Sequence, residues 1–260
     1  TSRLPSKAVD LALFRAFLED ERGVEATYTE EMRSDPPEFV KTYFDWLRES
    51  RGLTMEDPIH IGIFAHAANG GIKTDPNAFT GVPGLFAAGE VTGGMHGADR
   101  IGGLSTANGL VFGGKAGRSA AEACAETPEP PDEYLFHAAS SGNVPEVLST
   151  LQEAMFRNAM VIRGEEGLSA ALGTVERLSA DLSLCPSADV RAIAQTRRLT
   201  GRLHTAEAIL KAALLRRESR GAHYRADYPE ADPAQSSPII VSQDSGAIRA
   251  RFTKEDVPCS

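Results

Sequence analysis

Glycine is concentrated in one part of this sequence. Fourteen of the 24 glycines lie between Gly70 and Gly117, whereas the others are scattered along the chain. Glycine tolerates positive φ and lets the backbone approach a ligand or another segment closely. The segment therefore predicts a function that depends on the backbone, and this prediction constrains the fold around it.

The arrangement inside this segment is a strand, a loop and a helix start. The sequence predicts a buried strand at residues 84–89, a glycine-rich loop from Glu90 to Gly103 and a helix that opens at Ser105. A helix N-terminus presents free N–H groups and roughly half a positive charge to an anion or a polarised ring. Glu90 and Arg100 have no i, i+4 partner in the loop. The pattern indicates a loop that binds an anion or a cofactor, or a turn with two solvated charges, and the missing GxGxxG motif leaves both open.

The remaining sequence predicts mostly helices. Apolar spacing and turn residues predict helices at 8–20, 37–51, 144–160, 167–182 and 190–217, short strands at 59–65 and 72–74, and a hairpin of 239–243 with 247–252. A proline-rich connector at 127–131 separates the glycine-rich segment from the later helices. We expect the longest helix to need a bend.

Composition excludes several classes of protein. The 260 residues are 42% hydrophobic and 24% charged, which is ordinary for a globular chain that buries a core. A formal net charge of −9 argues against a nucleic-acid partner, and no apolar run reaches the ~20 residues of a transmembrane segment. The 3 cysteines lack zinc or disulfide spacing, so we expect no metal site and a soluble, cytoplasmic protein.

Three separated segments resemble one flavoprotein family. They are HAANGGIKTD at 66–75, PGLFAAGEVTGGMHGADRIGG at 83–103, and RESRGAHYR at 217–225 followed by DYPE at 227–230. In this order they are similar to the flavoproteins of succinate dehydrogenase, fumarate reductase and L-aspartate oxidase. The resemblance implies an α/β fold: the C-terminal part of an FAD-binding, Rossmann-like domain with a capping-domain remnant, followed by an all-α helical bundle.

The resemblance also implies domain boundaries and a cofactor. Residues 1–57 would be the C-terminal part of the capping (substrate) domain, 58–126 the C-terminal part of the FAD-binding domain, 134–230 the helical domain and 231–260 a tail with a hairpin. The cofactor would be FAD. Its binding residues would be Glu90, on the ribityl hydroxyls, and the helix start, whose N–H groups face the N1/O2 edge of the flavin ring: Gly103, Ser105 and Thr106.

The implied catalytic residues are Arg3, His66 and Arg100. His66 and Arg100 match the family's residues that hold a substrate carboxylate, for which the planar two-donor fork of arginine is suited. Arg3 matches the proton-delivering arginine. Asp99 stands where the family usually has Asn, and we expect it to neutralise Arg100 in part, so the substrate need not be a plain C4 dicarboxylate. Arg220 and His223 would lock the helical domain to the flavin domain.

These residues imply an FAD-dependent oxidoreductase of the fumarate reductase or succinate dehydrogenase type. A hydride would pass between flavin N5 and a carbon next to the carboxylate of a small acid. Residues 223–230 lean instead toward L-aspartate oxidase, which is the alternative enzyme. A non-catalytic scaffold that has lost its flavin is the alternative from another class, and the presence of Glu90, His66 and Arg100 argues against it.

The sequence lacks the N-terminal half that supplies most adenine and pyrophosphate contacts in this family. We therefore expect a second polypeptide that carries the N-terminal half of the FAD-binding domain. It would come from a split gene, from cleavage before Thr1 or from nicking during preparation. The other expected partner is the small carboxylate substrate.

Overall fold

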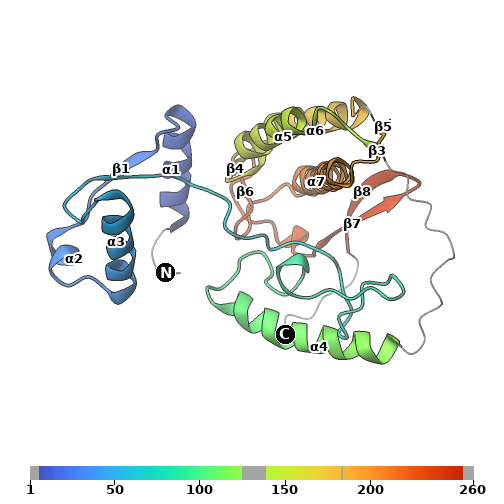
Figure 1. The fold of residues 1–260 in the computed structure, drawn as a ribbon, viewed down its shortest axis with the longest axis horizontal. Helices are drawn as coiled ribbons and strands as arrows, with labels where there is room; N and C mark the ends of the chain where they lie inside the picture. The colour runs from blue at the N-terminus through green and yellow to red at the C-terminus, as the bar shows by residue number, and fades with distance from the viewer. Residues whose placement is uncertain (1–5, 125–138, 183, 254–260) are drawn as a thin grey trace. The chain divides into compact units, whose positions relative to one another are not determined.

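The computed structural model describes residues 6–124, 139–182 and 184–253 of the chain. The chain divides into two compact units, residues 1–64 and residues 65–260, and each is described separately (Figure 1). In the described residues, no helix combines the length and the hydropathy that crossing a bilayer requires.

The first unit is a small α+β unit with its own apolar cluster. Its elements are α1 (Ser6–Glu19), β1 (Val24–Ala26), α2 (Glu30–Ser34), α3 (Glu38–Arg51) and β2 (Ile59–Ile61). The strands β1 and β2 pair antiparallel, with Val24 opposite Ile61. Helix α3 ends at Gly52 in the left-handed conformation, as C-caps favour. It buries Val40, Phe44 and Leu47, so the helices predicted at 8–20 and 37–51 are confirmed.

The glycine-rich segment forms one long helix and very little sheet. Its elements are η1 (Gly89–Val91) and α4 (Leu104–Ala123). The helix predicted to open at Ser105 is confirmed to within one residue. The buried strand predicted at 84–89 is wrong: Phe86 forms only an isolated bridge with Phe79, and Leu85 is 49% exposed. Buried strands need neighbours on both sides, and no described segment supplies them here. Likewise, the strand predicted at 72–74 is reduced to one bridge, between Ile72 and Thr92.

Three helices form the main hydrophobic core of the second unit. They are α5 (Val144–Ala159), α6 (Glu165–Ala180) and α7 (Val190–Leu215), and α5 and α6 lie against α7 (Figure 1). The Asp189 side chain caps α7 by accepting from the N–H groups of Arg191 and Ala192. Helix α7 runs without interruption over 26 residues. Its apolar stripe is buried between its partners: Leu199, Leu203, Ala206, Leu210 and Ala213.

The C-terminal hairpin packs on the bundle. Strands β7 (Ile239–Asp244) and β8 (Ala247–Phe252) pair antiparallel, as the sequence predicts. The Lys211 ammonium on α7 donates to the carbonyl of Ile248 at 3.0 Å. Short strands also pair between connections of the bundle: β3 (Ala139–Ser140) with β5 (Cys185–Pro186), and β4 (Ile162–Arg163) with β6 (Tyr224–Arg225).

Candidate functional site

Glu90 lies beside the segment that carries His66. Its carboxylate is exposed at the start of η1, and Oε1 accepts a hydrogen bond from the Ala68 N–H at 3.0 Å. The two segments then run side by side, because the Ile72 N–H donates to the carbonyl of Val91 at 2.8 Å. Glu90 and His66, which are distant in the sequence, therefore lie on neighbouring backbone segments.

The start of α4 has no side-chain cap. Gly103 precedes the helix with φ of +86°, a left-handed conformation that favours glycine, and no side chain caps the helix there. Thr106 N–H reaches back to the carbonyl of Gly103 at 3.2 Å. A helix start without a side-chain cap leaves N–H groups and dipole for a ligand. Gly103, Ser105 and Thr106 therefore lie at a helix start that no side chain caps, and their role in cofactor binding stays a prediction.

Arg100 is in direct contact with this helix start. Its guanidinium is half-buried, and Nη1 donates to the hydroxyl of Ser105. The structure therefore joins a residue expected to bind substrate to a residue expected to bind cofactor. Among the ion pairs between described residues, none joins Asp99 to Arg100. The structure gives no support to the expected neutralisation of Arg100 by its neighbour.

A buried polar pair lies close to the same helix start. The Asn108 amide on α4 is 3.3 Å from Nε2 of His96 in the loop, and Asn108 is 8% exposed. Asn108 Oδ1 and His96 Nδ1 are buried and have no hydrogen-bond partner among the described residues. Buried polar atoms are rarely left unpaired, so these two atoms have capacity for a polar ligand. Asn108 was missed from sequence, where the only signal was a polar residue on the helix one turn after Ser105.

The remaining predicted residues are less well defined. His66 is exposed, and its side chain has no hydrogen bond to any residue that the structure describes. Arg3 lies outside the described residues. The expected lock between the helical and flavin-binding segments exists, but the backbone makes it: the Ala222 N–H donates to the carbonyl of Ala98 at 3.0 Å. The side chain of His223 instead contacts Arg163 and Arg216 within the helical part.

Comparisons with known proteins identify the family. Residues 19–106 match the family described as FAD binding domain, and residues 148–258 match the one described as fumarate reductase flavoprotein C-term. The L-aspartate oxidase of Rhodospirillum rubrum is 36% identical over 205 residues, which are 77% of this chain and 69% of that protein. The chain belongs to the fumarate reductase, succinate dehydrogenase and L-aspartate oxidase flavoprotein family.

Other members of this flavoprotein family are about twice as long as the chain or longer. The matching subunit of the fumarate reductase (CoM/CoB) from Methanothermobacter marburgensis is 31% identical over 72% of this chain but only 37% of its own length. Sdh1 of Mycobacterium smegmatis has a TM-score of 0.75 and 28% identity, with 96% of this chain and 46% of that chain covered. A quinol-fumarate reductase structure, at 23% identity, shares the fold with a TM-score of 0.78. The predicted α/β class is confirmed.

The cofactor of this flavoprotein family is FAD, and the described residues fit it on two counts. The uncapped start of α4 at Gly103 suits the electron-rich edge of a flavin ring, since fixed N–H dipoles stabilise negative charge without reorganisation. The unpaired Asn108 Oδ1 and His96 Nδ1 add polar atoms with no partner of their own. In the described residues, no group of three or more His, Cys, Asp or Glu residues is placed to hold a metal ion.

Proposed function

We propose that this chain is one half of an FAD-dependent oxidoreductase of the fumarate reductase or succinate dehydrogenase type. The other half is a companion polypeptide that carries the N-terminal part of the FAD-binding domain. The substrate is a small acid with a carboxylate next to the reacting carbon. The sparse and unpatterned cysteines favour a cytoplasmic location.

The observation that carries this proposal is the contact between Arg100 and Ser105. A guanidinium held against the start of α4 places a carboxylate-binding group next to donors suited to a flavin ring. Binding and redox chemistry need this proximity, because hydride transfer requires the reacting atoms to be nearly in contact. A solvated turn or a purely structural loop would not need a carboxylate-binding guanidinium beside an uncapped helix start.

The chain's own residues have separate tasks in the proposed reaction. Arg100 and His66 hold the substrate carboxylate and orient the adjacent carbon. Glu90 receives the ribityl hydroxyls, and the helix start at Ser105 and Thr106 stabilises charge on the ring edge through its dipole. Bound FAD supplies a donor or acceptor of hydride at N5. Arg3 provides or receives the accompanying proton.

The surface of α4 supports a companion polypeptide. The one residue that this 20-residue helix buries is Asn108, while apolar side chains on it and before it remain open. Ile101 is 70% exposed, Leu110 is 74% exposed and Val111 is 64% exposed. Large apolar side chains exposed along one helix favour a partner that covers them. The missing half of the FAD-binding domain would cover them.

L-aspartate oxidation is the second candidate activity. It is favoured by the Rhodospirillum rubrum L-aspartate oxidase, of which this chain covers 69% at 36% identity. The same residues would serve, since L-aspartate also carries a carboxylate beside the carbon that is oxidised. In that case the C–N bond is oxidised, and the electrons pass on to oxygen or fumarate.

The test is an activity comparison on the flavin-loaded assembly of the chain and its companion. We expect either oxidation of a reduced dye by fumarate or release of peroxide from L-aspartate. Replacing Arg100 by Lys keeps the charge but removes the two-pronged donor, so kcat/KM should fall by about tenfold or more. Arg191→Lys, at the exposed start of α7 in the helical bundle, is the matched control and should have no effect.

Three results would contradict the proposal or its parts. Activity with neither substrate, in an assembly that has bound flavin, would remove both enzymatic candidates. An assembly that binds no flavin and turns over nothing would support the non-catalytic scaffold instead. Wild-type kinetics in Arg100→Lys would show that Arg100 does not hold the substrate.

A further inference from the structure

A tight turn at residues 220–223 contacts the loop that carries Arg100. Arg220 and His223 exchange two backbone hydrogen bonds, of 2.8 and 2.9 Å. Gly221 is the first central residue of the turn and has φ of +53°, a conformation that favours glycine. At the tip of the turn, the Ala222 N–H donates to the carbonyl of Ala98 at 3.0 Å.

Only glycine permits this approach at position 221. A Cβ placed on Gly221 would lie 2.2 Å from the carbonyl oxygen of Ala98 and 2.5 Å from its carbonyl carbon. Those atoms belong to the backbone and cannot rotate away, so a larger residue would push the two segments apart. Ala98 is two residues before Arg100, so such a displacement would act directly on the guanidinium.

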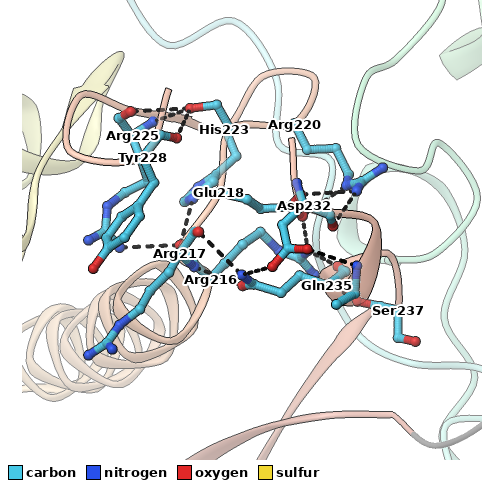
Figure 2. Close-up of polar contacts among 12 residues, drawn as sticks. Arg216, Arg217, Glu218, Arg220, His223, Arg225, Tyr228, Asp232, Gln235 and Ser237 are labelled. Atoms are coloured by element: carbon cyan, nitrogen blue, oxygen red, sulfur yellow. Dashed lines mark hydrogen bonds and ion pairs between the residues drawn. The ribbon is translucent and has the colours of Figure 1, made fainter. Parts of the chain in front are cut away.

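One side of the turn is held by a buried ion cluster (Figure 2). The Glu218 side chain is fully buried and accepts from Arg216 at 2.6 Å, from Arg220 at 2.9 and 3.0 Å, and from the Asp232 N–H at 2.7 Å. Burial alone would raise the pKa of Glu218, but these hydrogen bonds outweigh it and lower the pKa to about 2. A carboxylate with all its partners in place fixes the backbone of the turn.

The other side of the turn is tied to the helical bundle. Arg225 is fully buried, and its guanidinium donates to the carbonyl of Ala213 at the end of α7 at 2.8 Å. It also forms a two-pronged ion pair with Asp227, at 2.8 and 2.7 Å. Asp227 also accepts from the Glu165 N–H at the start of α6, at 2.9 Å. The turn is therefore joined to the ends of two core helices.

The Arg100 loop has much less support of its own. From residue 94 to residue 100, the bond from Ala222 to Ala98 is the single backbone–backbone hydrogen bond in the described part of the chain. The loop also contains Gly94 and Gly97, both with positive φ. Besides this bond, the loop is held by side-chain contacts of His96 with Asn108 and of Arg100 with Ser105, so its position depends on the segments it contacts.

We propose that the turn at 220–223 is a brace that positions Arg100, with Gly221 and Ala222 as positioning residues. The inference rests on the proposed function, in which Arg100 holds the substrate carboxylate. The helical domain then acts on substrate affinity although it supplies no residue that touches substrate. Its rigid cluster sets where the guanidinium of Arg100 lies relative to the start of α4.

The test compares Gly221→Ala with Gly246→Ala. Gly246 also has positive φ, but a Cβ there meets nothing within 4 Å, so it controls for backbone strain. In the full chain, we expect Gly221→Ala to speed amide hydrogen exchange at residues 97–103. In the flavin-loaded assembly, KM for the carboxylate substrate should rise roughly ten- to a hundredfold. We expect kcat and flavin content to stay within about twofold of wild type, and Gly246→Ala to leave exchange and kinetics alike unchanged.

The wild-type chain supplies a measurement that does not depend on the folding of a variant. The Ala222 N–H belongs to an exposed residue, yet it should be protected from exchange by its bond to Ala98. Rapid exchange at Ala222, or identical exchange and KM in the Gly221 and Gly246 variants, would overturn the brace. Absence of turnover in the wild-type assembly would instead overturn the proposed function.

Discussion

At the scale of single residues, the buried charges near the end of α7 are matched by specific partners. Arg225 and Glu218 are both fully buried, and each is satisfied by charged groups and backbone atoms rather than by solvent. A buried charge that loses its partner is strongly destabilising. These residues therefore hold the segment after α7 in one conformation. His223 sits among the same charges and is the member that titrates nearest to neutral pH.

His223 predicts a specific dependence of stability on pH. Burial, followed by the nearby charge of Arg163, lowers the pKa of His223 from 6.5 to about 4. The unfolded chain then binds a proton that the folded chain does not, so folding stability is full above pH 6.5 and falls as pH drops toward 4. At about 1.4 kcal/mol per pKa unit, this loss is at most about 3 kcal/mol. Glu218 and Asp227, with pKa values lowered to about 2, lose their stabilisation only below about pH 5, and they do so equally in both proteins.

The measurement is the free energy of unfolding by urea, followed by helical circular dichroism at pH 7, 5.5 and 4. His223→Gln keeps an acceptor and a donor but does not titrate. The wild-type chain should lose more stability than this variant between pH 6.5 and 4. Equal slopes for the two proteins would show that folding does not change the pKa of His223.

At the scale of elements, α7 is the helix on which the bundle depends. Leu210 is fully buried in the cluster between α5, α6 and α7, whereas its neighbour Ile209 is 43% exposed. Leu210→Ala should lower the free energy of unfolding by about 2–5 kcal/mol, because it removes buried methyl groups and leaves a cavity. Ile209→Ala is the matched control. It should cost less than about 1 kcal/mol, and equal losses in chemical denaturation would contradict this packing.

The elements also mark what could be predicted from sequence. The helices of the bundle and the C-terminal hairpin follow from apolar spacing and turn residues, since their partners are close by in the chain. The prediction of a strand at 84–89 was wrong, because its sequence is typical of a sheet whose other strands the described residues do not supply. The resemblance pointed to Glu90 and Arg100, but neither the Asn108–His96 pair nor the contact of Gly221 with Ala98 has a local signal.

At the scale of the whole molecule, the proposed companion polypeptide would cover exposed apolar side chains on α4 and before it. The chain covers 46% of Sdh1 of Mycobacterium smegmatis. Glu90 is exposed, and the start of α4 is uncapped. Neither feature alone encloses a cofactor, since a ligand of this size is held by burial of most of its surface.

The most direct test is to mix the chain with a separately produced N-terminal half of the FAD-binding domain and with FAD. Size-exclusion chromatography with detection of flavin absorbance then separates the species. We expect the chain alone to elute without flavin, and the two polypeptides together to elute as one complex with one FAD. Flavin retained by the chain alone, or a complex of the two halves without flavin, would contradict the account.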